Sequence, residues 1–493
     1  MVFKSKTFAG GYKFKRFEGF PDNELIEIPV PPRVIIPLKQ GFGMEVPPIV
    51  KIGQSVKAGQ VIGIDDNTIS NPVHSSISGT VEAITHLAGN NKEIKAITIK
   101  SNGTPEWQPL SNYSAEWSKL TNEKLEKIIY LSGIASLGSD GIPTRYKSSV
   151  ALPGDVRSII VNGINSEVYN LSNSVLLTEQ RIYKFVQGLK ILHKIMPNAK
   201  ILFALNRDQN DIIQELVNQI KGIDWINILT FNVKYPLDSQ RVLVNTILKK
   251  KYPYYSFAVK EIGVLLLKIQ TVLHIFEAVT KGKPLIEKII ALCGSGFNRN
   301  MHIKIRLGTF FQEIIKNYSQ SNIKQRIVAN SLLTGKSIND LNQPIDRKIN
   351  SIIAIPEDTK RRFLAFIRPG FRKDSYSNTF FSFLKKKGNT NMHGEQRPCI
   401  FCNYCNEACP VKILPFLIYQ YVERDLIGQI LINLKIFDCI NCNLCSYICP
   451  SKIPVASFIK KGKNELLKQS EDFPSLKLLK INSKRRELYE EIK

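Results

Sequence analysis

Cysteine is missing from the first 292 residues of this 493-residue chain, and eight of its nine cysteines lie between Cys399 and Cys449. A secreted fold held together by disulfides spreads its cysteines through a short chain, so this distribution excludes that class of protein. Clustered cysteines instead indicate metal ligation in a reducing compartment. Cys293 stands alone, and we expect it to be a buried structural residue.

Long apolar runs are also missing. The most apolar stretch, 262–279, is interrupted by Lys268, Gln270, His274 and Glu277, so we expect no transmembrane helix. The charged first 19 residues are not followed by the apolar core of a secretory signal. Together these absences predict a protein that is soluble or peripheral to a membrane and that works in the cytoplasm.

Acidic residues are scarce relative to basic ones: 42 Asp and Glu stand against 68 Lys and Arg, for a net charge of +26. Such a balance favours an anionic partner, whether nucleic acid, an anionic membrane, an acidic protein or a phosphorylated cofactor. Because no basic patch is interleaved with aromatic residues, we expect no nucleic acid among the partners. The 43% hydrophobic content excludes a disordered chain.

Two segments near the start of the chain, 47–64 and 71–84, each predict a strand, a turn and a strand. This pattern resembles the barrel-sandwich fold of biotinyl and lipoyl carriers, which have a Lys at the tip of the central hairpin. The corresponding tip here, 65–71, has no Lys. We therefore expect a structural module that carries no lipoyl or biotinyl group.

A run of cysteines with fixed spacing occurs twice in the C-terminal part: Cys399, Cys402, Cys405 and Cys409 before Pro410, then Cys439, Cys442, Cys445 and Cys449 before Pro450. Bacterial ferredoxins use this run to hold two [4Fe–4S] clusters, because thiolates are soft anionic ligands matched to iron. In ferredoxins the fourth Cys of each run binds the other cluster. This assigns Cys399, Cys402, Cys405 and Cys449 to cluster 1, and Cys439, Cys442, Cys445 and Cys409 to cluster 2. The alternative is a pair of four-cysteine zinc sites, which need neither the third Cys at this spacing nor the Pro.

The chain therefore reads as a multidomain α/β protein. Apolar strands alternate with helical patterns between about 120 and 280, which indicates a parallel sheet flanked by helices. The expected units are a barrel-sandwich (1–110), a central Rossmann-like α/β domain (111–280), a small β-grasp-like α+β domain (281–355), a basic connecting segment (356–395), an α-helical dicluster ferredoxin domain (396–460) and a charged helical tail (461–493).

Four features in order along the chain resemble the C subunit of the Rnf electron-transport complex and the A subunit of the Na⁺-translocating NADH:quinone reductase. They are FAGGYKF (8–14) with IPLKQGFG (36–43) and NPVHSSISGTV (71–81); KYPLDSQ (234–240) with AVTKGKPLIEKIIALCGSG (278–296) and IRLGT (305–309); the double cysteine run; and RRFLAFIRPGFRKDSYSNTFFS (361–382) with NTNMHGEQRP (389–398). The cysteine run is similar to the Rnf protein and the fourth feature to the sodium-pump protein, so the chain is identified as a mosaic of the two.

Relatives in this superfamily that bind FMN and NADH carry a Gly-rich loop, to which 136–144 corresponds here, and a second element, to which 162–169 corresponds. The resemblance implies that Gly138, Gly141, Thr144, Asn162 and Glu167 are the candidates for an FMN or NADH site. Ser and Asp have entered the loop at 139 and 140, and an Asp there would repel a phosphate. The altered loop therefore favours a decayed flavin site over a working one.

The resemblance implies a peripheral electron-transfer subunit of a membrane-bound, ion-translocating oxidoreductase of the NADH:ferredoxin or NADH:quinone type. Its cofactors would be two [4Fe–4S] clusters, and its partners integral-membrane and flavoprotein subunits, with NADH or ferredoxin as further ones. Its place would be the cytoplasmic face of the cell (inner) membrane. No residue needs to act as a catalytic acid or base, since the chemistry belongs to the cofactors. The alternative is a docking or assembly subunit that has lost its flavin site.

Overall fold

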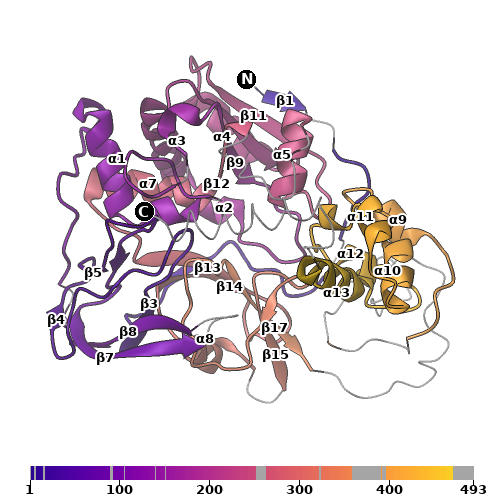
Figure 1. Ribbon diagram of the computed structural model, residues 1–493. Helices are drawn as coiled ribbons and strands as arrows, with labels where there is room; N and C mark the ends of the chain where they lie inside the picture. The colour runs from indigo at the N-terminus through magenta and orange to yellow at the C-terminus, as the bar shows by residue number, and fades with distance from the viewer. Residues whose placement is uncertain are drawn as a thin grey trace.

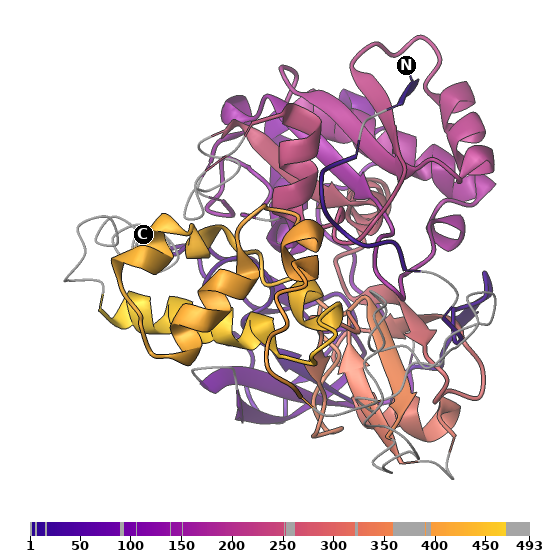
Figure 2. The same ribbon diagram turned by 90° about the vertical axis from the view of Figure 1, so that its right-hand side faces the viewer.

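The computed structural model describes residues 2–4, 7–14, 17–88, 93–104, 106–138, 140–149, 151–250, 252, 262–320, 324–357, 390 and 396–469. Most of the expected basic segment, and the tail beyond 469, lie outside this part. The described chain forms four units (Figures 1 and 2). A central domain lies above a barrel-sandwich and a six-stranded sheet, and a helical C-terminal unit packs against the central domain and the six-stranded sheet.

The central domain is a five-stranded parallel sheet with the order β1-β11-β10-β9-β12. Its strands are β1 (Val2–Lys4), β9 (Ser158–Gly163), β10 (Lys200–Asn206), β11 (Ile226–Phe231) and β12 (Val264–Lys268). Alternate residues of β9 point to opposite faces. Ile159 and Val161 pack under α1 (Asn122–Leu131), α3 (Glu179–Ile195) and α7 (Ile269–Lys281). Ile160 packs with α5 (Gln240–Leu248) on the other face, so the sheet is buried on both faces, as predicted.

The order of the strands reverses at β9. After β9 the chain proceeds through β10, α4 (Asn210–Gln219) and β11 to one side, and it then returns to place β12 on the other side of β9. In open parallel sheets, ligands bind in the crevice outside the carboxyl ends of the strands at such a switch point. The segments that follow β9 and β12 are therefore the expected lining of a site.

The barrel-sandwich consists of a four-stranded and a two-stranded sheet around one apolar core. The strands are β3 (Arg33–Pro37), β4 (Ser55–Val56), β7 (Gly79–Ala88) and β8 (Glu93–Ser101), with β5 (Val61–Gly63) paired to β6 (Val73–His74). The six-stranded sheet has the order β16-β15-β17-β13-β14-β2 and is accompanied by α8 (Phe311–Tyr318). Its strands are β2 (Leu25–Glu27), β13 (Glu287–Cys293), β14 (Met301–Arg306), β15 (Gln325–Ala329), β16 (Lys336–Ser337) and β17 (Ser351–Pro356).

Two strands within the expected unit 1–110 pair with sheets outside the barrel-sandwich. β1 pairs with β11 at the edge of the central sheet, and β2 pairs with β14 at the edge of the six-stranded sheet. Both strands cover edges that would otherwise present unpaired backbone groups. The local pattern of apolar residues can predict a strand, but it does not say which sheet the strand joins. The sequence alone therefore did not predict these two pairings.

The C-terminal unit, described over 396–469, contains helices and loops, and these residues form no strand. Two short helices, α9 (Tyr404–Ala408) and α12 (Leu444–Tyr447), follow the two cysteine loops, and α10 (Pro415–Glu423) and α11 (Gln429–Asn433) lie between the runs where two helices were predicted. The last helix, α13 (Val455–Lys468), crosses the expected boundary at 460, because Leu466 packs in the same core as Ile459. Within the described residues no helix is both long and apolar enough to cross a membrane.

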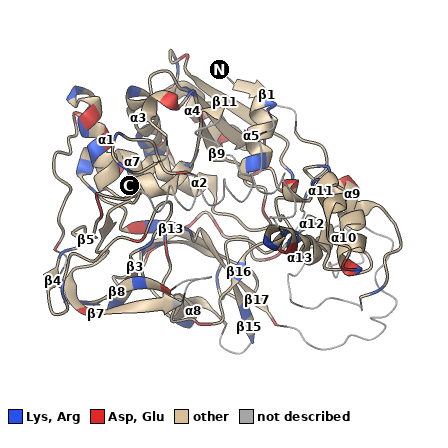
Figure 3. Ribbon diagram, viewed as in Figure 1, with Lys and Arg blue, Asp and Glu red and all other residues tan. Residues whose placement is uncertain are grey.

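In the view of Figure 3, the Lys and Arg residues of the described chain occur on all four units and are interspersed with Asp and Glu.

Candidate functional sites

The two runs of cysteines surround two small cavities. One cavity is lined by Cys399, Cys402, Cys405 and Cys449, and the other by Cys409, Cys439, Cys442 and Cys445. Each cavity thus receives three thiols from one run and the fourth from the other, which is the crossed grouping expected from the spacing. In the described part of the chain, no three His, Cys, Asp or Glu side chains converge on one point as a mononuclear metal site requires. The thiols of each set surround a space instead.

The backbone around both cavities follows the same pattern. Asn403 and Asn443 adopt left-handed conformations, with φ of 63° and 60°, and each begins the short helix that carries the third thiol. Lys412 and Lys452 adopt φ of 56° and 57° after the two prolines. The two runs are therefore repeated in conformation as well as in sequence, so the first set can be compared with the second position by position.

Each set includes a thiol with a clearly raised pKa. Burial, followed by the neighbouring thiols Cys449 and Cys402, raises the pKa of Cys405 to about 12. Burial likewise raises the pKa of Cys442 to about 12. Four thiolates around one small cavity need a soft, multiply charged cation between them, and an iron–sulfur cluster has that chemistry. The donor sets therefore fit two such clusters.

The Cys439 set is the one next to the rest of the chain. The Tyr235 hydroxyl donates to the carbonyl oxygen of Cys442 at 2.7 Å, and Arg241 pairs with Asp438 at 2.9 Å. Ile440, in the same loop, packs against the apolar cluster between the central sheet and α5. These contacts anchor the second cysteine loop on the central domain.

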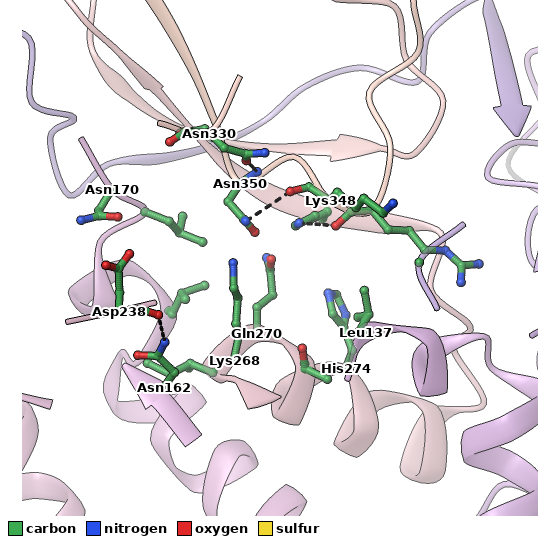
Figure 4. A pocket seen from close by; sticks show the side chains of 18 of the residues that line it. Leu137, Asn162, Asn170, Asp238, Lys268, Gln270, His274, Asn330, Lys348 and Asn350 are labelled. Carbon is green, nitrogen blue, oxygen red and sulfur yellow. Dashed lines mark hydrogen bonds between the residues drawn. The ribbon is translucent and has the colours of Figure 1, made fainter. Parts of the chain in front are cut away.

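A pocket of about 650 Å³ lies at the switch point of the central sheet, facing the six-stranded sheet. Lys268, Gln270 and His274 extend from the end of β12 and from α7 on one side of it (Figure 4). Asn330, Lys348 and Asn350 lie on the opposite side, in segments flanking β15 and β17. The pocket is thus formed by residues of two domains that are distant in sequence.

Only some of the predicted flavin-site residues line this pocket. Gly138, Asn162 and Glu167 do, whereas Gly141 and Thr144 are not among its lining residues. Gly141 has φ +80°, and a Cβ there would lie 2.2 Å from the Ser148 carbonyl oxygen. The Thr144 hydroxyl is hydrogen-bonded to that of Ser148 at 2.7 Å. These two residues therefore hold the shape of the loop.

Asp140 is buried, and it is not among the residues that line the pocket. Burial raises the pKa of Tyr252, and the negative charge of Asp140 adds to that shift. The reason for expecting a decayed site was the place of Asp140 in the loop, and this residue does not line the pocket. Ser139 lies outside the described residues.

A pair of carboxyl groups and a lysine lie at one end of the pocket. Burial, and then the charge of Asp238, raise the pKa of Glu167 to about 8, while Ser331 donates to its Oε2 at 2.8 Å. Burial also raises the pKa of Asp238, which accepts a short hydrogen bond from Ser166. Burial lowers the pKa of Lys268, and the two carboxylates oppose that shift. All three shifts favour the uncharged form of each group, so together these side chains carry less charge near neutral pH than they would in water.

The first turn of α7 opens into the same pocket. Its N-cap, Lys268, makes no side-chain capping hydrogen bond, and Ile269, Gln270 and Thr271 all line the pocket. The free N–H groups at the start of a helix attract anions, and a lysine beside them strengthens the attraction. This end of the pocket is therefore suited to a phosphate group.

Two more buried cations approach the pocket from the six-stranded sheet. Burial and the nearby Lys268 lower the pKa of Lys288 to about 7, and its Nζ donates to the Arg347 carbonyl oxygen at 2.6 Å. The Arg347 guanidinium donates to the Gly133 carbonyl oxygen at 2.7 Å and to the Ser136 hydroxyl at 2.8 Å. Arg347 thereby fixes the start of the Gly-rich loop from another domain.

Sequence reasoning missed the residues that bring most charge to the pocket. Asp238 lies within the motif 234–240 that carried part of the resemblance, so a signal for it was present. Lys268 was noted only as an interruption of an apolar stretch. Lys288 lies within the motif 278–296, which also carried part of the resemblance. Arg347 belongs to a strand-rich segment of another domain, and no local pattern connects it with the pocket.

Three family models match the chain. They are the RnfC barrel-sandwich hybrid domain over residues 6–104, the Nuo51 FMN-binding domain over 129–277 and a 4Fe-4S dicluster domain over 398–453. The second of these spans most of the pocket residues of the central domain, and the third spans all eight clustered cysteines.

Curated relatives match most of the chain. The C subunit of the ion-translocating oxidoreductase complex of Buchnera aphidicola is 29% identical over 76% of this chain and 72% of the relative. The protein of that name in Pseudomonas aeruginosa is 28% identical over 93% of this chain and 55% of the relative. The C subunit of the proton-translocating ferredoxin:NAD⁺ oxidoreductase complex of Clostridium ljungdahlii is 25% identical over 85% of both. The chain spans only about half the length of several of these relatives.

Half of the chain also matches half of a crystal structure of an NAD⁺-reducing [NiFe]-hydrogenase, at a TM-score of 0.38 and 11% identity. A similarity as loose as this supports no argument about function. The segment 361–398, on which the likeness to the sodium-pump protein rests, lies almost entirely outside the described residues.

Proposed function

Since the chain belongs to the family of the C subunits of ion-translocating oxidoreductase complexes, we propose that it relays electrons within such a complex. In this proposal the two sets of cysteines hold two [4Fe–4S] clusters and the central pocket holds FMN. The observation that carries the proposal is the arrangement of the sites: two cavities each surrounded by four thiols, with the second anchored beside a pocket at the switch point.

Cys399, Cys402, Cys405 and Cys449 would hold one cluster, and Cys409, Cys439, Cys442 and Cys445 the other. Bound clusters supply one-electron transfer, and the protein adjusts their potentials through burial and hydrogen bonds. Here Lys463, which is buried, donates to the Cys439 carbonyl oxygen at 2.5 Å. Its positive charge therefore favours the reduced, more negative state of the second cluster.

The pocket offers what a flavin mononucleotide needs. Lys268 and the first turn of α7 suit the phosphate, and Gly138 allows close approach of backbone. FMN exchanges electrons singly or in pairs, which suits it to stand between a hydride donor and one-electron carriers. The raised pKa of Glu167 allows this carboxyl group to hold a proton near neutral pH, at the end of the pocket that lies towards Tyr235.

The alternative function, a docking or assembly role without a flavin, rested on the altered Gly-rich loop. That reasoning loses its force because Asp140 does not line the pocket. The match of the FMN-binding model to 129–277 also favours a working site. We therefore retain the electron-transfer function as the better account.

The proposal extends to location and partners, because the relatives are named as subunits of complexes. This chain would associate with integral-membrane and flavoprotein subunits. It would lie at the cytoplasmic face of the cell membrane as a peripheral subunit. NADH or ferredoxin would exchange electrons with the assembled complex.

The flavin site is tested by titrating the purified chain with FMN and with riboflavin, which lacks the phosphate. Lys268→Met should weaken FMN binding by about tenfold or more, because it removes a charged donor, and should leave riboflavin binding unchanged. Lys127→Met, on the exposed side of α1, is the matched control and should change neither. If the wild-type chain binds no FMN, or if Lys268→Met weakens both ligands equally, the flavin assignment is wrong.

A further inference from the structure

The two cysteine loops differ in what covers them, although their sequences and conformations correspond. The second loop, Cys439-Ile440-Asn441-Cys442, has its Ile440 packed against the central domain. The first loop, Cys399-Ile400-Phe401-Cys402, has its Ile400 58% exposed and its Phe401 64% exposed. Ile440 is thus partly covered, whereas the equivalent Ile400 is open to solvent. Asn441, like Phe401, is exposed, but it presents a polar side chain where the first loop presents an aromatic ring.

Phe401 has a backbone conformation that a bulky side chain disfavours. Its φ is 54°, in the left-handed region where Asn is tolerated and a bulky side chain is not. The equivalent Asn441 has φ 55°, so the second loop uses the residue that suits the backbone. Phe401 gains one aromatic contact, with Phe416 at 6.2 Å between ring centroids, and most of the ring remains exposed. A strained, exposed aromatic side chain is better explained by an interaction than by the fold.

The Ile400–Phe401 tip, as we call these two residues, lies at the mouth of the Cys399 cavity, which both residues and Phe416 line. The second loop occupies the same place relative to the Cys439 cavity, and there Ile440 packs against the central domain. The central domain also contains the proposed flavin pocket. The second loop therefore contacts the domain with the redox site inside the chain, whereas Ile400 and Phe401 of the first loop remain exposed.

We propose that the Ile400–Phe401 tip is the docking site for an electron-transfer protein from outside this chain. The partner presents an apolar surface that covers the tip as the central domain covers Ile440. This inference rests on the proposed function, because it takes the Cys399 cavity to hold the cluster that exchanges electrons with the partner. Beyond the proposed function, it names the surface that binds the partner, the two residues at its centre and the apolar character of the contact.

Phe401→Asn is the informative variant, because it installs the residue of the second repeat. Asn suits the left-handed backbone, so the variant should fold and melt at least as well as the wild type. Leu426→Asn is the matched control, since Leu426 is 54% exposed on the same helical unit but does not line the Cys399 cavity. Because Phe401 lines the Cys399 cavity, the iron content and the rate of electron donation to ferricyanide are measured in both variants, so that an effect on the cluster is separated from an effect on docking.

The test measures electron transfer from each chemically reduced, iron-loaded chain to membranes of the host strain from which this chain has been deleted. For Phe401→Asn we expect the concentration that gives half the maximal rate to rise by about tenfold, as for an aromatic residue at the centre of an interface. The control should match the wild type. A wild-type rate for Phe401→Asn, or an equal loss in Leu426→Asn, would overturn the proposal.

Two further outcomes are distinguishable. If sedimentation shows that the wild-type chain self-associates and that Phe401→Asn abolishes the association, the tip binds a second copy of this chain and the proposal is wrong. If the purified chain holds no iron, the proposed function itself fails. Normal iron content with an unaffected Phe401→Asn variant would refute only the docking site.

Discussion

The buried carboxyl group of Glu167 should make the stability of the central domain depend on pH. Its pKa is about 8 in the folded chain, against 4.5 for the free side chain. Because the folded value is the higher one, its contribution to stability is fully present below about pH 4.5 and is lost as the pH rises towards 8. If Glu167 titrated alone, the loss would approach about 5 kcal/mol. Asp238 and Lys268 adjust their own protonation as Glu167 ionises, so we expect about half of that.

Glu167→Gln tests this prediction, because Gln copies the protonated carboxyl group and still accepts the hydrogen bond from Ser331. Unfolding of the central domain in urea can be followed by the fluorescence of Trp225, which stacks on His193 in this domain. Between about pH 5.5 and about pH 9, the variant should become more stable relative to the wild type by about 2 kcal/mol. A difference that does not change with pH, or a Glu167 carboxyl that an infrared titration finds ionised below about pH 5, would refute the reasoning.

Three other changes have defined outcomes. Cys409→Ser should damage the cluster held by Cys439, Cys442 and Cys445; selective loss of the electron paramagnetic resonance signal of the other cluster would contradict the crossed grouping. Arg347→Met should speed hydrogen exchange in 133–138 and weaken FMN binding, with a loss of about 3 kcal/mol in local stability; unchanged exchange would show that Arg347 does not fix the loop. Intact mass of chain purified from its host should show no lipoyl or biotinyl group, and an adduct on the barrel-sandwich would disprove that expectation.

The cysteine sites are the part for which the sequence makes the most specific prediction. Ligand spacing is a local property, and the run was repeated, so the eight residues and their crossed grouping follow from the residue numbers alone. Locating α10 and α11 between the runs was possible for the same reason, since the helical pattern of 413–437 is contiguous. The resemblance to the Rnf protein rested on motifs in order along the chain, and the comparisons confirm it.

The central pocket was predicted only in part, because its residues come from distant segments. Asn162 and Glu167 follow β9, Lys268 ends β12, and Lys288 belongs to another domain. No periodicity links these positions; only the strand order, with β9 at the switch point, brings them together. Asp140 shows that a place in a motif does not establish a contact, since it belongs to the loop but does not line the pocket.

Joint quantification of iron, acid-labile sulfide and flavin in the anaerobically purified chain tests the central claim most directly. The account predicts about eight irons and about eight sulfides per chain, from two clusters with four cysteines each, together with FMN at up to one per chain. Stoichiometric zinc without iron would contradict it, because the eight thiols would then be structural zinc ligands and the chain would relay no electrons through them.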